Sequence, residues 1–193
     1  MLGWSKTSPL TTQEVLMFEA VEIYQFRGLR SLLNTPKGKQ VFFYEDEHYY
    51  LSNFSAFALV VGGETWMTVE HIYQAMKFSD HLRIRGLIKD ALSAHVSREI
   101  ARANKKLVRS DWNQVKLQIM ESLIKTKISQ HPYVLRRLLE TGDAILIENS
   151  NENAFWGRGS DWCGQNHLGR IWMKLRGQER TLHVEGKGIP KEH

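Results

Sequence analysis

The chain contains a single cysteine, Cys163, and has no long hydrophobic run. One cysteine excludes an internal disulfide framework and is typical of a reducing compartment. No apolar stretch approaches the roughly 18 residues that a membrane-spanning helix needs. The N-terminus also lacks the basic residues and following apolar block of a secretory signal. We therefore predict a cytoplasmic protein with no membrane partner.

Several catalytic signatures are absent too. The eight histidines are scattered, and none lies in an HExxH motif or in the paired Cys/His spacing of a metal site. There is no GxSxG elbow or Walker loop, and the segment GRGSDWCG does not follow the dinucleotide fingerprint. We therefore predict neither a metal nor a cofactor. Metal-free hydrolysis by a carboxylate and an amine is left open, and it suits a glycosidic bond because a nearby carboxylate stabilises an oxocarbenium-like transition state.

With 193 residues, the chain is long enough to bury a core as one domain. Its hydrophobic content of 42% and charged content of 24% are ordinary for a globular protein. The formal net charge is +5, and eight lysines and arginines lie between Leu82 and Arg109. Such a run indicates either a footprint for phosphate or nucleic acid, or simply a solvated helix face.

Hydrophobic periodicity predicts a helix-rich chain with few strands. Strands are expected at 41–45, at 57–61 and 64–68 as a hairpin turning at Gly62–Gly63, and at 144–147. Helices are expected from Val69, near 81–91, near 94–106, after Asp111, from Pro132 to Gly142, and from Leu168 to a stop at Gly177. The predicted fold class is α+β, a predominantly helical single domain with a small antiparallel sheet.

A breaker cluster at 34–40 separates an N-terminal leader from the main body. The leader, residues 1–40, is expected to be partly helical because residues 11–14 form a capping box, and its role cannot be assigned from the sequence. The main domain is expected at 41–177. The polar tail at 178–193 is expected to be disordered.

One helix face carries an unusual set of polar groups. In the helix that begins after Thr68, the residues Glu70, Gln74 and Lys77 follow helical spacing, about 100° around from the apolar stripe. A carboxylate, an amide and an amine therefore project together at the border of the core. The alternative is structural, because an N-cap threonine followed by a first-turn glutamate also stabilises a helix without any catalysis.

The polar segment at 148–166 is a second candidate. Loops longer than about 12–15 residues inside a compact domain are usually functional or disordered. This one contains Trp156, Trp162 and three glycines, at 157, 159 and 164. Tryptophans offer flat faces for stacking and glycines allow close approach to a ligand, so a functional loop is predicted.

The sequence resembles the YbiA-like (NADAR) family of N-glycosidases, in matching segments that keep the family's order over residues 41–176. Each segment alone is weak, but several in register are specific. The segments are LSNF at 51–54, Trp66, TVEH at 68–71, QAMKF at 74–78, RSDW at 109–112 with Lys116 and Met120, 139–143, 146–148, FWGRG at 155–159, GQNHLG at 164–169 and 173–176.

The resemblance implies hydrolysis of N-glycosidic bonds in phosphorylated ribosyl compounds. Some members of the family act on ribosylaminopyrimidine intermediates of riboflavin biosynthesis, and others remove ADP-ribose from guanine. The resemblance makes Glu70 the catalytic carboxylate and Lys77 the amine that forms a Schiff base in members that remove ADP-ribose. The residues implied in substrate binding are Asn53, Phe54, Trp112, Trp156, Gly157, Gly159 and Asn166. Basic residues near 102–109 would help to hold phosphate.

The chain departs from the family at one catalytic position. Asn153 stands where an aspartate is common, with Glu152 beside it. Because an asparagine side chain cannot act as a general base, the chain is expected to be slower, to prefer another substrate, or to use Glu152 instead.

Three hypotheses follow. The first is a metal-free N-glycosidase whose partner is a phosphorylated ribosyl or ADP-ribosyl small molecule, or an ADP-ribosylated nucleic acid. The second is a catalytically weakened module that binds ADP-ribose or a modified nucleic acid without cleaving it; Asn153 favours it, and the intact Glu70 and Lys77 disfavour it. The third is a sequence-tolerant nucleic-acid binder, which would show a steep salt dependence.

Overall fold

The computed structural model describes residues 39–46 and 48–184. The predicted leader helix and the last nine residues of the tail lie outside this part of the chain. The helices are α3 (Val69–Ala75), α4 (Leu82–Lys89), α5 (Ala94–Ala103), α6 (Trp112–Gln130), α7 (Pro132–Glu140) and α8 (His167–Val184). The strands are β1 (Gln40–Phe43), β2 (Leu59–Val61), β3 (Glu64–Trp66) and β4 (Ile145–Glu148). Short 3-10 turns are η1 (Tyr49–Leu51), η2 (Met76–Phe78) and η3 (Lys105–Leu107).

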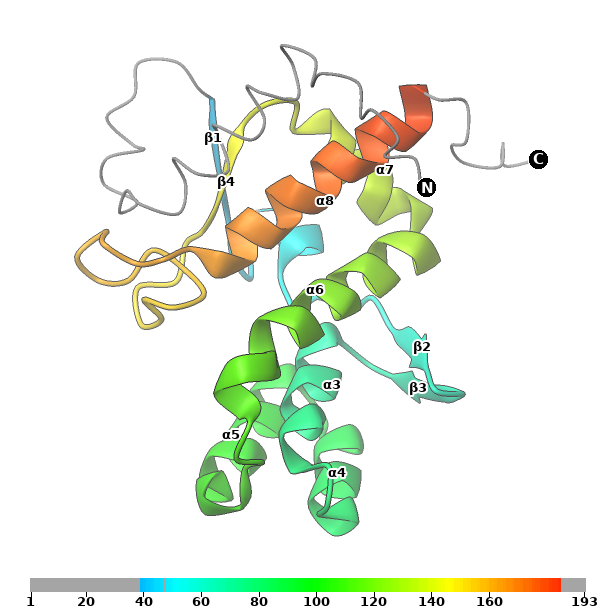
Figure 1. The fold of residues 1–193 in the computed structure, drawn as a ribbon, viewed down its shortest axis with the longest axis vertical. Coiled ribbons are helices and arrows are strands. Elements are labelled where there is room, and N and C mark those ends of the chain that lie inside the picture. The colour runs from blue at the N-terminus through cyan, green and yellow to red at the C-terminus, as the bar shows by residue number, and fades with distance from the viewer. Residues whose placement is uncertain (1–38, 47, 185–193) are drawn as a thin grey trace, which may run out of the picture.

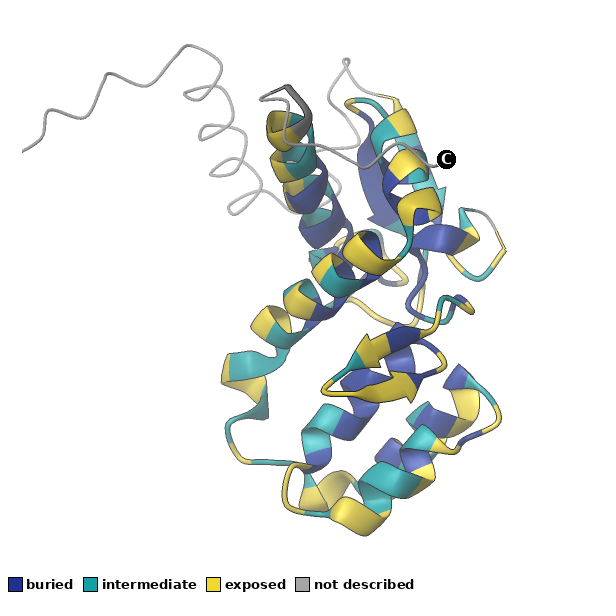
Figure 2. Cartoon of the chain, turned by 90° about the vertical axis from the view of Figure 1, so that its right-hand side faces the viewer, coloured by how far each residue is buried: buried dark blue, intermediate teal, exposed yellow. Residues whose placement is uncertain are grey.

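Helix α6 connects the two ends of the domain (Figure 1). Helices α3, α4 and α5 pack together at one end, while α7, α8 and the β1–β4 pair lie at the other. Figure 2 shows that the helices bury one face and expose the other, as amphipathic periodicity requires. These elements confirm the predicted fold class, a predominantly helical α+β domain.

The strands form two separate two-stranded sheets. Strands β2 and β3 make the predicted antiparallel hairpin, and Gly62 and Gly63 turn it with φ of +61° and +78°. Side chains are strained at such values, so glycine suits both positions. Strand β1 instead pairs in parallel with β4, with Phe43 opposite Glu148. This parallel pair was not predicted, because no local pattern links two strands so distant in sequence.

Helix α3 begins where the sequence predicts. Thr68 is the N-cap, and its hydroxyl accepts a hydrogen bond from the main-chain N–H of His71 at 3.3 Å. The α-helix ends at Ala75, and the chain continues as the 3-10 turn η2. Lys77 therefore lies in η2, three residues and one tighter turn beyond Gln74.

Helix α8 continues to Val184, so the predicted stop at Gly177 is wrong. Tertiary contacts outweigh the weak helix propensity of one glycine. The Arg176 guanidinium donates to the Thr141 hydroxyl at 2.7 Å and to a main-chain carbonyl at 2.8 Å, and Arg180 forms an ion pair with Asp143 at 2.6 Å. Residues 178–184 are thus helical, and the prediction of disorder is wrong for that part of the tail.

Candidate active site

Glu70 is a buried carboxylate on the first turn of α3, with only 6% of the residue exposed. The Gln74 amide donates a 2.6 Å hydrogen bond to Glu70 Oε1, and the Glu70 main-chain N–H donates to the Asn53 carbonyl at 3.0 Å. Burial raises the pKa of the Glu70 carboxyl, against the opposing effects of the Gln74 hydrogen bond and the Lys77 charge. A role in helix stability alone does not account for this burial, because a glutamate can serve the helix dipole while exposed.

Lys77 lies close enough to Glu70 for each charge to affect the other. Its Nζ is 5.3 Å from the centroid of the Tyr73 ring and 5.6 Å from that of the Trp112 ring. Burial lowers the pKa of the Lys77 amine, while the Glu70 carboxylate raises it. The structure therefore brings the predicted carboxylate and amine together, with the amine in partly apolar surroundings that favour its neutral, nucleophilic form.

A second carboxylate, that of the half-buried Glu148, ends strand β4, and no role was predicted for it from the sequence. Burial and the nearby Glu70 charge raise the pKa of Glu148 to about 8. Its Oε2 atom is buried and has no hydrogen-bond partner in the described part of the chain. At neutral pH most of this carboxyl is protonated, so Glu148 can act as a proton donor. The sequence signal was a charged residue directly after the buried apolar strand at 144–147.

The other flank of Glu70 is formed by Phe54 and helix α5. The Phe54 ring centroid lies 4.9 Å from that of His95 and 5.2 Å from the guanidinium carbon of Arg98. The charges of His95 and Arg98 oppose the burial that raises the Glu70 pKa. Phe54 was predicted as a substrate-binding residue, and Arg98 belongs to the basic run between Leu82 and Arg109, whereas no role was predicted for His95.

Aromatic rings surround Tyr73 on the side of the site near Lys77. The Tyr73 ring centroid lies 5.0 Å from that of Trp112 and 5.6 Å from that of Trp156. The structure thus brings together Trp112 and Trp156, two predicted substrate-binding residues from distant segments of the chain. Flat faces of this kind can stack against a sugar or a base.

Asn153 is exposed, and its side chain closes a turn of the long loop. Its Oδ1 atom accepts hydrogen bonds from the main-chain N–H groups of Phe155 at 3.1 Å and Trp156 at 3.0 Å. An aspartate could accept the same two bonds, so asparagine preserves the turn without supplying a titrating group. The neighbouring Glu152 is also exposed.

Two other predicted ligand contacts, Gly157 and Asn166, hold the loop against β4. A Cβ atom on Gly157 would lie 2.7 Å from the Glu148 carbonyl oxygen, so only glycine allows this close approach. The buried Asn166 accepts a hydrogen bond from the Glu148 main-chain N–H at 3.0 Å and donates to the Leu146 carbonyl at 2.8 Å. Gly159 adopts a φ of +68°, a value that favours glycine. These contacts position Glu148.

The basic run at 102–109 divides into two groups. Arg102 is exposed and pairs with Glu99 at 3.2 Å on the surface of α5. Lys106 and Arg109 instead line a hollow of about 240 Å³ together with Lys77 and Asp80. Arg109 forms an ion pair with Asp111, so Lys106 is the residue of this group that adds positive charge beside Lys77.

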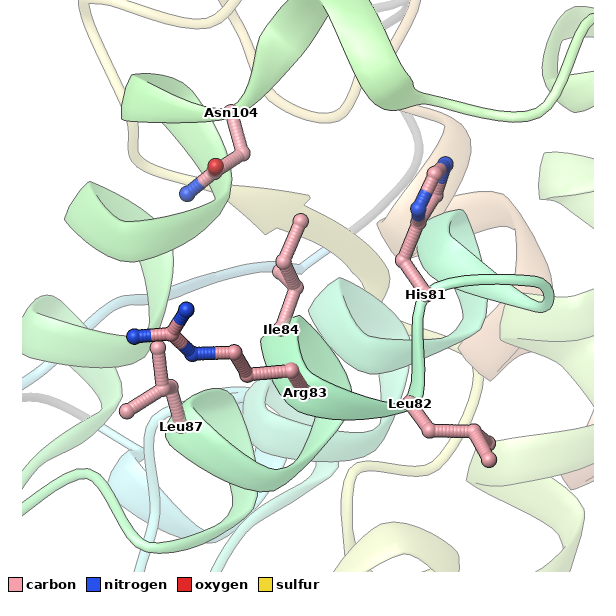
Figure 3. A pocket seen from close by; sticks show the side chains of 6 residues that line it. All are labelled: His81, Leu82, Arg83, Ile84, Leu87 and Asn104. Carbon is pink, nitrogen blue, oxygen red and sulfur yellow. The ribbon is translucent and has the colours of Figure 1, made fainter.

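Figure 3 shows another hollow, of about 530 Å³, between α4 and the end of α5. Its lining residues are His81, Leu82, Arg83, Ile84, Leu87 and Asn104. None of the predicted site residues belongs to this lining, so the hollow is distinct from the site around Glu70.

Lys127 is fully buried on α6 and fixes the segment that carries Asn53. Its Nζ atom donates hydrogen bonds to the Ser52 carbonyl at 2.9 Å and to the Ser55 hydroxyl at 2.6 Å. Two aromatic rings flank the amine. Burial lowers the pKa of Lys127 well below its ordinary value. Helix α6 and the segment that bonds Glu70 are thereby joined through one side chain.

We expect the stability of the protein to depend on pH through Lys127. Because its pKa is lower in the folded state than in the unfolded state, the unfolded chain holds more protons below the ordinary lysine pKa of about 10.4. This residue therefore adds a rise in stability with pH, of at most about 1.4 kcal/mol per pH unit. Urea denaturation at several values between about pH 7 and pH 9.5 should show this slope reduced in Lys127→Met. Lys125→Met, at an exposed position on the same helix, should keep the wild-type slope, and an unchanged slope in Lys127→Met would contradict the assignment.

Within residues 39–46 and 48–184, no group of three or more His, Cys, Asp or Glu side chains lies close enough to hold a metal ion. Over the same residues, no helix is long and apolar enough to cross a membrane. The cytoplasmic location stays a prediction.

The chain belongs to the NADAR domain family, whose model matches residues 42–180. It is 38% identical over 133 residues to the N-glycosidase YbiA of Escherichia coli K12, which covers 69% of this chain and 82% of that protein. An N-glycosidase of Nostoc punctiforme is 38% identical over 146 residues, or 74% of this chain and 94% of that protein. A riboflavin biosynthesis protein of Vibrio vulnificus is 36% identical over 138 residues, but the match spans only 37% of that longer protein.

The solved NMR structure of Escherichia coli YbiA is similar in fold, with a TM-score of 0.70 and 32% sequence identity. The similarity covers 86% of this chain and 98% of that one. These comparisons confirm the predicted family, and relatives named as N-glycosidases confirm the predicted class of enzyme. The roles of individual site residues stay predictions.

Proposed function

We propose that the protein hydrolyses the N-glycosidic bond of a phosphorylated ribosylaminopyrimidine of riboflavin biosynthesis. The observation that carries this proposal is a pair of carboxylates in different surroundings, the buried Glu70 and the half-buried Glu148, whose Oε2 atom is itself buried. Glu70 has a hydrogen-bond donor in Gln74 and the cations Lys77 and Arg98 nearby, whereas the Oε2 atom of Glu148 has no partner among the described residues. The negative charge of the pair therefore resides on Glu70 and the proton on Glu148.

This division of charge defines an acid and a base for hydrolysis. Glu148 gives its proton to the leaving nitrogen as the bond between that nitrogen and the sugar C1 breaks. The Glu70 carboxylate stabilises the positive charge that develops at C1 and then takes a proton from water, whose oxygen bonds to C1. The products are the free pyrimidine amine and ribose 5-phosphate. Return of one proton from Glu70 to Glu148 restores the starting state.

The rest of the site supports binding of such a substrate. Tyr73, Trp112 and Trp156 offer aromatic faces for the pyrimidine ring. The hollow that contains Lys106 and Arg109 supplies positive charge for the phosphate. Asn153 is assigned to the turn that orients Trp156, because its two hydrogen bonds lead to that loop.

A second candidate function is the removal of ADP-ribose from guanine, which the environment of Lys77 favours. Its amine lies between two aromatic rings, and burial lowers its pKa. A neutral amine can attack the C1 aldehyde of an opened ribose, losing water to form an imine. Hydrolysis of that imine would release the sugar and restore the amine.

Mass spectrometry of two parallel incubations tests these functions. One contains freshly made ribosylaminopyrimidine 5′-phosphate, and the other contains an oligonucleotide with ADP-ribosyl-guanine; wild type is compared with Glu70→Gln in both. We expect ribose 5-phosphate from the first incubation, only with wild type. Borohydride added to the second incubation would reduce an imine and leave the sugar attached to Lys77.

Each outcome assigns one function. Release of ADP-ribose, with label on Lys77, would replace the metabolite by the modified base as substrate. Binding without release in both incubations would contradict the enzyme proposal and favour the module that only binds ADP-ribose or modified nucleic acid. Release that is unchanged in Glu70→Gln would remove that residue from the mechanism.

A further inference from the structure

Buried polar atoms without partners concentrate around Glu70. In the described part of the chain there are five such side-chain atoms, of which four belong to Asn53, Gln74, Arg98 and Glu148. Most buried polar atoms in folded proteins are hydrogen-bonded, so each exception needs an explanation. All four residues interact with Glu70. Gln74 does so through its side-chain hydrogen bond and Asn53 through its main-chain carbonyl, whereas Arg98 and Glu148 interact with it electrostatically.

Two of the four atoms are amide oxygens, which accept hydrogen bonds, namely Asn53 Oδ1 and Gln74 Oε1, while Glu148 Oε2 belongs to the carboxyl that carries the proton in the proposed mechanism. The occupant of this region must therefore offer O–H or N–H donors to the two amide oxygens. A phosphate does not fit here, because it brings acceptors of its own and negative charge beside Glu70. A sugar with free hydroxyl groups does fit.

The hydrogen bond between Gln74 and Glu70 identifies which amide atom of Gln74 lacks a partner. It is 4% exposed, and its Nε2 atom donates to Glu70 Oε1 at 2.6 Å. Turning the amide over would exchange the two atoms and would still leave one of them without a partner. With Glu70 ionised, the nitrogen must face the carboxylate, so the unpartnered atom is the oxygen.

We propose that Gln74 Oε1 accepts a hydrogen bond from the 2-hydroxyl of the ribosyl group, and that this contact makes the site select ribose over 2-deoxyribose. The inference rests on the proposed function in placing C1 of the sugar at Glu70. The amide group of Gln74 directly adjoins that carboxylate, and the 2-hydroxyl is the donor nearest to C1 on the sugar. Hydrogen bonds to this hydroxyl strengthen in the transition state of glycoside hydrolysis.

The test uses two matched pairs of molecules. The first is the ribosyl and 2-deoxyribosyl form of the same aminopyrimidine 5′-phosphate, with each rate divided by the uncatalysed rate. The second is ribose 5-phosphate and 2-deoxyribose 5-phosphate, whose binding is measured by calorimetry without any turnover. Wild type should prefer the ribosyl form by about 100-fold in rate enhancement, because a missing hydroxyl leaves a buried acceptor unpaired.

Gln74→Met keeps the length of the side chain and removes its oxygen. We expect the preference for ribose to fall at least about tenfold in this variant, in both rate and binding. Its rate with the ribosyl substrate should fall as well, because Glu70 loses its donor, so the ratio between the sugars is the informative quantity. Gln130→Met is the matched control, since this α6 glutamine bonds only the main chain of Val60 and should leave the ratio unchanged.

The combined results separate this inference from the proposed function. Turnover without a preference for ribose in wild type would overturn the contact and leave the enzyme proposal in place. A preference in binding that Gln74→Met loses, without any turnover, would keep the contact and overturn the enzyme proposal. Neither turnover nor preference would overturn both. Equal rates and equal binding of the two sugars in wild type would overturn the inference even if Gln74→Met does not fold.

Discussion

Replacing Glu70 by glutamine should reduce kcat/KM by roughly 10³-fold, within the range of about 10²–10⁴ for the loss of an acid–base group. The amide can still accept the Gln74 hydrogen bond, so the local packing is kept while the charge is lost. The loss has two causes: the developing positive charge at C1 is no longer stabilised, and no base takes the proton from water. Steady-state kinetics with ribosylaminopyrimidine 5′-phosphate would measure it.

The same variant should be as stable as wild type at neutral pH, or more stable. The pKa of Glu70 is raised in the folded state, so the folded protein binds this proton more tightly than the unfolded chain does. Stability from this group is present below the unfolded pKa of about 4.3 and is lost as pH rises through the folded pKa. Glutamine carries no charge at this position, so the variant does not lose this stability at neutral pH. Urea denaturation at pH 7 would measure the difference in the free energy of unfolding.

A control variant separates the site from general charge effects. Glu64→Gln removes an exposed carboxylate of the β2–β3 hairpin. This carboxylate forms an ion pair at 2.8 Å with Lys89, the last residue of α4. Its kcat/KM should stay at the wild-type value. Wild-type activity in Glu70→Gln, with a normal circular dichroism spectrum, would show that another group performs the reaction.

Replacing Glu148 by glutamine should reduce kcat by about 10²–10³-fold and change the pH profile. In the proposed mechanism Glu148 acts as an acid only when protonated, so wild-type activity should fall as pH rises through its pKa of about 8. In Glu148→Gln the residual activity should not show this alkaline fall. The profile of kcat/KM is the right measurement, because it reports the groups of the free enzyme.

The matched control is Glu152→Gln, an exposed carboxylate four residues further along the loop. The sequence offered Glu152 as the base that could substitute for the missing aspartate at Asn153. If Glu152→Gln loses activity and Glu148→Gln does not, the acid–base assignment belongs to the loop and not to the end of β4. We expect the reverse.

The part of the site within one local segment could be predicted from the sequence. Thr68 starts a helix, and helical spacing then brings Glu70, Gln74 and Lys77 to one side, because that geometry depends only on neighbours in the chain. Glu148 was missed because its burial depends on β1 and on the loop that ends at Asn166. Contacts of that range leave no periodic pattern.

The same distinction explains the other differences. Gly177 is a reasonable helix end by propensity, but Arg176 and Arg180 contact the segment after α7, and these contacts help to carry the helix further. Gly157 was expected to approach a ligand, whereas its close neighbour is the Glu148 carbonyl. In each case the residue type was informative, but its partner lay elsewhere in the chain.

The parallel pairing of β1 with β4 has a consequence for how activity arises during folding. Gln40 and Ile145 are partners although about 105 residues separate them, so this pair closes nearly the whole domain. Closing such a long loop is entropically slow compared with forming α3 or the β2–β3 hairpin. The helix with Glu70 can therefore form early, while Glu148 reaches its buried position only after the last strand has joined the first. In the proposed mechanism, a chain that ends before β4 would hold the base without its acid, and hydrolysis would start only after β4 has paired with β1.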